Sequence, residues 1–141
     1  MKISKILVST LIAFGLGFSC DLFAETSVII HPSNGSSLDQ DTVNKIYLGK
    51  TKSFSNGSSV IAINLKEGLP IRTGFDKAIL NKSASQVKSY WSKLLFTGKG
   101  TPPQEVGSDA EMIALISTNP SAIGYVDSGA VTGDVKVLFT F

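Results

Sequence analysis

The side chain best suited to binding chemistry in this sequence is its one arginine, Arg72, which lies in the segment Arg72-Thr73-Gly74. The segment follows an expected strand and loop and occupies the first turn of an expected helix. A basic residue is poorly placed there, because the helix dipole is positive at that end. An anion bound to the free backbone N–H groups would reverse the penalty. A salt bridge to an acid such as Glu67 or Asp76 explains the position equally well, so both interpretations stay open.

Two further residues are candidates on position alone. Tyr125 ends the expected strand Ile123-Gly124-Tyr125-Val126, and strand ends in α/β folds border ligand crevices. His31 is the only histidine, so any Ser-His-Asp hydrolase would depend on it. The sequence has no Gly-x-Ser-x-Gly elbow, and a base without an orienting group is unsupported. We therefore favour a structural or surface histidine and keep the hydrolase as a minor alternative.

Composition excludes several classes of site. The chain has 141 residues, one Cys and one His, so multi-ligand Cys/His metal centres are ruled out. A net charge of +2 gives no electrostatic case for nucleic acid or for an anionic membrane surface. The acidic pairs Asp39/Asp41 and Asp109/Glu111 each lie in the first turn of an expected helix, where capping and the helix dipole explain them. Nothing indicates an enzyme or a cofactor.

The first 24 residues have the pattern of a secretory signal. Lys2 and Lys5 precede the apolar stretch 6–18, which is shorter than the roughly 20 residues that span a bilayer. Leu22-Phe23-Ala24 ends in the small residue that signal peptidase requires. We expect cleavage after Ala24, leaving 25–141 as one periplasmic or secreted domain without a membrane span. Cys20 leaves a lipid-anchored N-terminus as a second option.

The rest of the chain alternates strands and helices. Apolar runs predict strands over 27–30, 59–65, 122–126 and 135–141. Helical spacing predicts helices from 39–41 to Gly49, over 71–80, over 85–96 with Ser85 as cap, and from a Ser108 cap through Thr118. This order indicates an α/β domain with a mixed sheet flanked by helices in three layers.

Three segments in order resemble the substrate-binding proteins of phosphate ABC transporters. They are Ile46–Lys50, the strand Val60–Asn64 followed by Arg72–Phe75, and Asn119–Val126. The resemblance covers about residues 28–127. It implies a type II periplasmic-binding fold, of which this chain has the length of a single lobe.

The resemblance also implies a ligand, which is phosphate or a similar anion. Phosphate-binding members carry a Ser-Gly-Thr run at the helix start, where this chain has Leu69-Pro70-Ile71. Arg72 alone carries over as an anion contact, and Thr73 is a nearby hydroxyl. The expected site is therefore Arg72, Thr73 and Gly74, with Ser33, Asn34 and Tyr125 as candidate wall residues.

A single lobe leaves an anion hydrated and screened, so we expect weak binding or a site completed by a homodimer or an envelope protein. The alternative is an accessory module that has lost its ligand contacts and presents the former inter-lobe face to an envelope partner. The apolar Leu69-Pro70-Ile71 favours this alternative.

Overall fold

The computed structural model describes residues 25–141. The expected signal segment 1–24, its cleavage site and Cys20 lie outside the described residues. The strands are β1 (Thr26–Ile30), β2 (Ile61–Leu65), β3 (Gln104–Val106), β4 (Ala122–Asp127) and β5 (Lys136–Thr140). The helices are α1 (Gln40–Tyr47), α2 (Pro70–Ala78), α3 (Ala84–Phe96) and α4 (Asp109–Thr118), with a short 3-10 turn at Ser128–Ala130.

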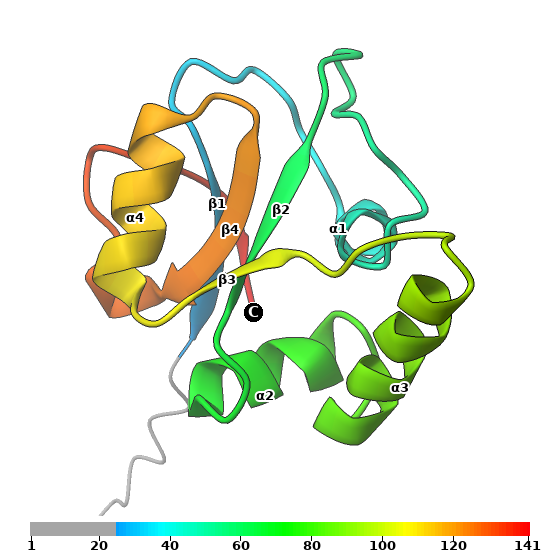
Figure 1. The fold of residues 1–141 in the computed structure, drawn as a ribbon. Coiled ribbons are helices and arrows are strands. Elements are labelled where there is room, and N and C mark those ends of the chain that lie inside the picture. Colours follow the sequence, from blue (N-terminus) through cyan, green and yellow to red (C-terminus); the bar gives the residue numbers. More distant parts are fainter. Residues whose placement is uncertain (1–24) are drawn as a thin grey trace, which may run out of the picture.

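The five strands form one mixed sheet in the order β3-β2-β4-β1-β5. Strand β2 runs parallel to β3 and β4, whereas β1 runs antiparallel to β4 and β5. Figure 1 shows α4 on one side of this sheet and α1, α2 and α3 on the other. The expectation of a mixed sheet flanked by helices is confirmed.

Strand β4 joins the two halves of the core, because its side chains alternate between the two faces. Gly124 faces α4, where an added Cβ would collide with the sulfur of Met112. The next residue, Tyr125, faces the opposite layer, and its ring stacks on Phe75 of α2 at 3.8 Å between centroids. Tyr47 of α1 packs against Phe75 at 4.7 Å and donates its hydroxyl to the Ile63 carbonyl at 2.7 Å. These aromatic rings fix α1 and α2 against the sheet.

The helix caps agree with the sequence in part. Ser108 caps α4, as predicted, by accepting a hydrogen bond from the Glu111 amide. Helix α3 begins one residue earlier than expected, and Ser83 caps it in place of Ser85. Ser83 is favoured because Gln86 lies three residues later and returns a hydrogen bond to the Ser83 amide, completing a capping box.

One strand is absent from the sequence prediction, and the other four differ from it at their ends. β3 is the missed strand. Its three residues have no apolar alternation, and pairing with β2 alone defines it. The regular part of β2 starts at Ile61, because Ser59 is taken up by a bridge to Ser53. β1 and β4 each extend one residue beyond the prediction, and β5 is shorter than 135–141. In residues 25–141 no helix is long and apolar enough to cross a membrane.

Candidate functional site

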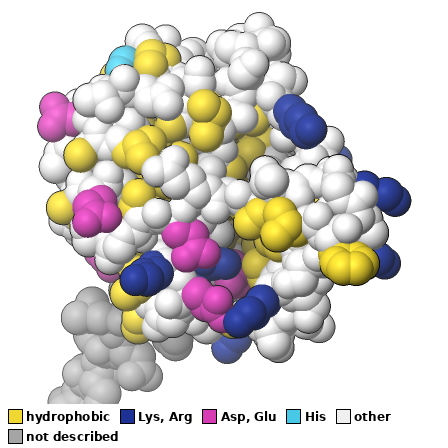
Figure 2. Space-filling view, viewed as in Figure 1, with side chains coloured by type: hydrophobic (Ala, Val, Ile, Leu, Met, Phe, Trp, Pro, Cys, Tyr) yellow, Lys and Arg dark blue, Asp and Glu magenta, His cyan; other side chains and the backbone are white. Residues whose placement is uncertain are grey.

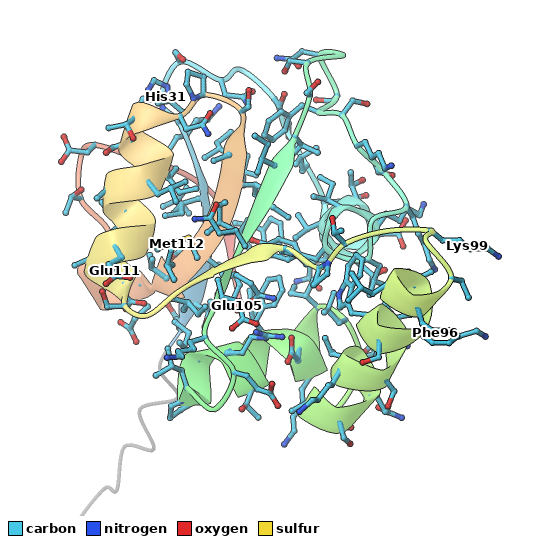
Figure 3. The ribbon with its side chains drawn as sticks, viewed as in Figure 1. His31, Phe96, Lys99, Glu105, Glu111 and Met112 are labelled. Carbon is cyan, nitrogen blue, oxygen red and sulfur yellow. The ribbon has the colours of Figure 1, made fainter. Side chains whose placement is uncertain are left out.

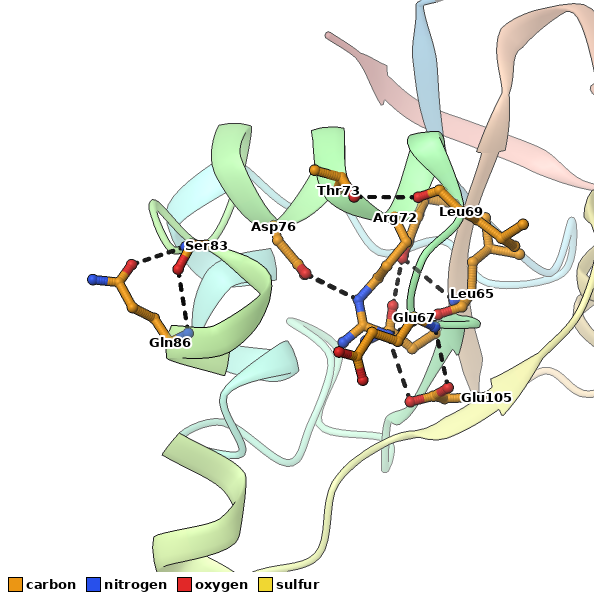
Figure 4. A network of polar contacts seen from close by, with 11 residues as sticks. Leu65, Glu67, Leu69, Arg72, Thr73, Asp76, Ser83, Gln86 and Glu105 are labelled. Carbon is orange, nitrogen blue, oxygen red and sulfur yellow. Dashed lines mark hydrogen bonds and ion pairs between the residues drawn. The ribbon is translucent and has the colours of Figure 1, made fainter. Parts of the chain in front are cut away.

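Arg72 lies in the first turn of α2, and its side chain is only 9% exposed. Its Nε donates to both carboxylate oxygens of Asp76, one turn later, at 3.1 Å. Its Nη1 donates to the Leu65 carbonyl at 2.8 Å and lies 3.5 Å from Oε1 of Glu105 (Figure 4). The structure therefore shows the salt bridge that the sequence left open. The guanidinium also ties α2 to the ends of β2 and β3.

Burying the Arg72–Asp76 ion pair costs desolvation free energy, and this cost is evident in the pKa of Asp76. Burial raises the pKa of Asp76 above its ordinary value, although the neighbouring Arg72 guanidinium works in the opposite direction. The Asp76 side chain is 1% exposed, so desolvation outweighs the attraction of its partner. The pair holds the arginine in a fixed position without fully stabilising the carboxylate.

A cleft of about 180 Å³ opens beside Arg72, between α3, β3 and the end of β2. Figure 2 shows acidic and basic side chains meeting in the lower middle of this face, next to apolar ones. The lining combines these charged groups with an apolar wall: Asn64, Glu67, Arg72, Ala84, Val87, Lys88, Trp91, Ser92, Leu95, Pro102, Pro103 and Glu105.

Two residues that line this cleft each have a side-chain donor without a hydrogen-bond partner among the described residues. Nε and Nη1 of Arg72 are used, whereas the structure gives no partner for its Nη2 within residues 25–141. Asn64 is 3% exposed, and its Oδ1 accepts a hydrogen bond from the Tyr125 hydroxyl, while its Nδ2 has no partner among the described residues. The Tyr125 hydroxyl in turn accepts from the Leu65 amide at 3.3 Å. In the described part of the chain, Arg72 and Asn64 therefore each have a free N–H donor at the cleft, and the hydrogen bonds of their other polar atoms fix the two side chains in position.

The carboxylates around the cleft limit which ligands it suits. Glu105 faces Arg72, and its Oε2 accepts from the Glu67 amide at 3.4 Å. Glu67 also lines the cleft, as does Lys88 from α3. With the buried Asp76, three acids surround two bases. A small dianion entering here would meet a net negative group of side chains, which weakens its binding.

A second hollow, of about 430 Å³, lies at the edge where β2, β3 and β4 end. Its apolar part is the start of α2, Leu69-Pro70-Ile71, which has no side-chain cap. Its polar part includes Asp109 and Asp127, and burial raises the pKa of Asp109 above its ordinary value. The remaining lining residues are Thr26, Gly74, Gly107 and Ser108. This surface is apolar and acidic, which is unsuited to a free anion.

The other predicted site residues are dispersed. Thr73 donates its hydroxyl to the Leu69 carbonyl at 3.4 Å. Ser33 and Asn34 lie in the loop after β1 and line neither hollow. Tyr125 is fully buried and reaches the cleft only through Asn64.

His31 is placed without the partners of a catalytic base. Its Nδ1 lies 2.7 Å from Oγ of Ser33, and within residues 25–141 no carboxylate hydrogen-bonds its ring. In the same part of the chain no group of three or more His, Cys, Asp or Glu side chains is placed to hold a metal ion.

Sequence reasoning missed the cleft residues other than Arg72. Asn64 carried a usable signal, because it is a single amide inside the apolar run 60–65. Trp91 was assigned to the core, and it is indeed buried, yet one side of it lines the cleft. Glu105 carried no signal, because it is positioned by β3, which the sequence did not reveal.

Comparison with solved structures identifies the fold. An ABC-type phosphate transport receptor from Vibrio cholerae matches with a TM-score of 0.63 and 16% identity, over 82% of this chain and 46% of that one. A putative phosphate ABC transporter substrate-binding protein with bound phosphate, from Clostridium perfringens, matches with a TM-score of 0.65 and 20% identity, over 82% and 45%. PstS from Borrelia burgdorferi matches with a TM-score of 0.61 and 17% identity, over 82% and 47%.

The chain spans about half the length of these proteins and has the fold of one of their lobes. Neither a protein-family model nor a curated protein matches the sequence.

Proposed function

We propose that this protein is an exported, non-enzymatic solute-binding module that holds the oxyanion group of an otherwise apolar ligand in the Arg72 cleft. The observation that carries the proposal is the pair of unpartnered donors, Arg72 Nη2 and Asn64 Nδ2, at the wall of one cavity. Arginine is suited to carboxylate and phosphate groups because its planar fork of N–H donors matches their oxygens. The likeness to phosphate-binding proteins supports an oxyanion as the recognised group.

The apolar wall of the cleft indicates which kind of group the oxyanion of the ligand is attached to. Trp91, Leu95 and Pro102 face the same cleft as the donors. Most of the affinity would come from the apolar surface that they bury, since Glu67 and Glu105 oppose additional negative charge. Inorganic phosphate alone should therefore bind weakly, and a monoanionic carboxylate or phosphate ester with an apolar group should bind better.

Trp91 makes the proposal directly testable, because it is the only tryptophan of the chain and lines the cleft. We would titrate the protein with inorganic phosphate, sulfate, benzoate and phenyl phosphate while following tryptophan fluorescence and heat. Saturable binding of benzoate or phenyl phosphate, tighter than that of inorganic phosphate, is expected.

The matched variants are Lys88→Gln, inside the cleft, and Lys52→Gln, an exposed lysine outside it. The first should weaken binding several-fold and the second should leave it unchanged. Flat titrations with all four anions, from protein shown to be folded by circular dichroism, would refute the proposed site.

A second candidate function, docking of an envelope protein, is favoured by the hollow around Leu69-Pro70-Ile71. Its apolar floor beside Asp109 and Asp127 suits a partner that offers an apolar side chain flanked by a basic group. Crosslinking in envelope extracts would test it, with Ile71→Ser compared with Ile61→Ser, since Ile61 is exposed elsewhere. A crosslinked partner lost only with Ile71→Ser would support this function, and none lost would count against it.

A further inference from the structure

The segment from Lys77 to Gln104 carries an unusually one-sided charge. It contains five lysines and no acidic residue, and it is bounded by Asp76 and Glu105. Over the whole chain basic and acidic residues are nearly balanced, at 13 and 11. The lysine excess is therefore local to the end of α2, to α3 and to the turns at the two ends of α3; the lysines are Lys77, Lys82, Lys88, Lys93 and Lys99.

The same region carries the most exposed large apolar side chain of the described residues. Phe96, the last residue of α3, is 94% exposed, and its neighbour Leu95 is 55% exposed. Figure 3 shows Phe96 and Lys99 pointing outward from the end of α3, away from the sheet. Lys93 and Lys99 are exposed on either side of Phe96 in the sequence. An aromatic ring so fully in water contributes nothing to the core of this domain.

We propose that the C-terminal end of α3 docks on the surface of an anionic lipid bilayer, with Phe96 entering the headgroup region. Lysines near an anionic surface attract it electrostatically, and each contributes roughly fivefold to the partition coefficient. An aromatic side chain beside such lysines adds the apolar contact that interfacial binding requires. The occupant follows from the charge of the segment, which is complementary to phosphate headgroups.

The geometry favours a lipid surface over a folded acidic partner. Phe96 projects from a helix end, and the lysines point to different sides of α3. Lys82 lies over the Tyr90 ring at 5.9 Å, whereas Lys88 borders the Arg72 cleft. Lys93 and Lys99 are therefore the lysines that a surface could meet together with Phe96. A fluid lipid surface needs only their charge, whereas a protein interface needs partner groups in a fixed register. Docking through α3 would also leave the apolar and acidic hollow at the start of α2 free for other contacts.

The test is co-sedimentation of the purified protein with vesicles of phosphatidylglycerol and phosphatidylethanolamine, compared with phosphatidylcholine vesicles. One N-terminal form of the protein is used throughout, so that residues 1–24 contribute equally to every measurement. We expect preferential binding to the anionic vesicles, reduced at least tenfold by raising the salt from 50 to 300 mM, because screening shortens the reach of the lysines.

The variants are Phe96→Ser and the double variant Lys93→Gln/Lys99→Gln, which change only exposed side chains. Each should weaken anionic-vesicle binding about tenfold or more. The matched controls, Val137→Ser and Lys136→Gln, should have no such effect, because both residues are exposed on β5, at the opposite edge of the sheet from β3. Equal binding to both vesicle types, or equal losses in variants and controls, would overturn the proposal, as would binding to an acidic protein without binding to vesicles.

Discussion

Replacing Arg72 with methionine should destabilise the protein strongly, because it leaves a buried carboxylate without its partner. Asp76 is 1% exposed and receives both Nε contacts of the arginine at 3.1 Å. Removing one member of a buried ion pair costs about 3–5 kcal/mol of unfolding free energy. The Leu65 carbonyl also loses its 2.8 Å hydrogen bond, which is included in that range.

The double variant Arg72→Met/Asp76→Leu should recover part of this loss. It removes the uncompensated charge and leaves the Leu65 carbonyl as the main unsatisfied group, at a cost of about 1–3 kcal/mol. The cost of the single variant should also depend on pH. Burial already raises the pKa of Asp76, and loss of the arginine raises it further.

A raised pKa in the folded state means that the folded protein holds the proton more tightly than the unfolded chain does. Stability contributed by that proton is present below the ordinary value of 3.8 and is lost as the pH rises through the folded-state pKa. Arg72→Met should therefore cost more at pH 7 than at pH 4. Urea unfolding, followed by Trp91 fluorescence, measures this cost at each of the two pH values. A double variant no more stable than the single one, together with a cost that does not change with pH, would refute the reasoning.

Three further predictions concern stability and can be checked by urea unfolding. Ser83→Ala removes the capping box of α3 and should cost about 1 kcal/mol, whereas Ser85→Ala should cost clearly less. Gly124→Ala forces a methyl group against Met112 and should cost about 1–3 kcal/mol; combined with Met112→Ala, the total should fall short of the sum of the two single losses. Asp109→Asn should flatten the pH dependence of stability above pH 3.8, because burial raises the pKa of Asp109 and its proton-linked stability is lost as the pH rises; an unchanged slope would contradict this.

The sequence predicted the elements that have strong local signals. Ser108 followed by Asp109 and Glu111 marked the start of α4, and the apolar spacing around Trp91 marked α3. It did not predict β3, because three residues with one apolar side chain carry no periodicity and acquire strand geometry only from β2. Local patterns reveal a strand when its own side chains alternate between core and water.

The site was predicted less completely, for a related reason. The position of Arg72 at a helix start was clear, but whether it met an anion or Asp76 depended on what α2 packs against. The cleft needs three distant segments together, because Asn64 comes from β2, Trp91 from α3 and Glu105 from β3. A single sequence gives no distance between such segments, so their meeting became visible only in the folded chain.

The place of β1 in the sheet has a consequence for the order of folding. Its two neighbours, β4 and β5, come from the far end of the chain, and the Oγ of Ser27 bonds that of Thr140 across 113 residues. All five residues of β1 are buried, so until those strands arrive its backbone groups and apolar side chains have no partners. Contacts of such long range close slowly. A chain that is still being synthesised therefore cannot complete its sheet, and β1 stays unpaired until the C-terminal strands are available.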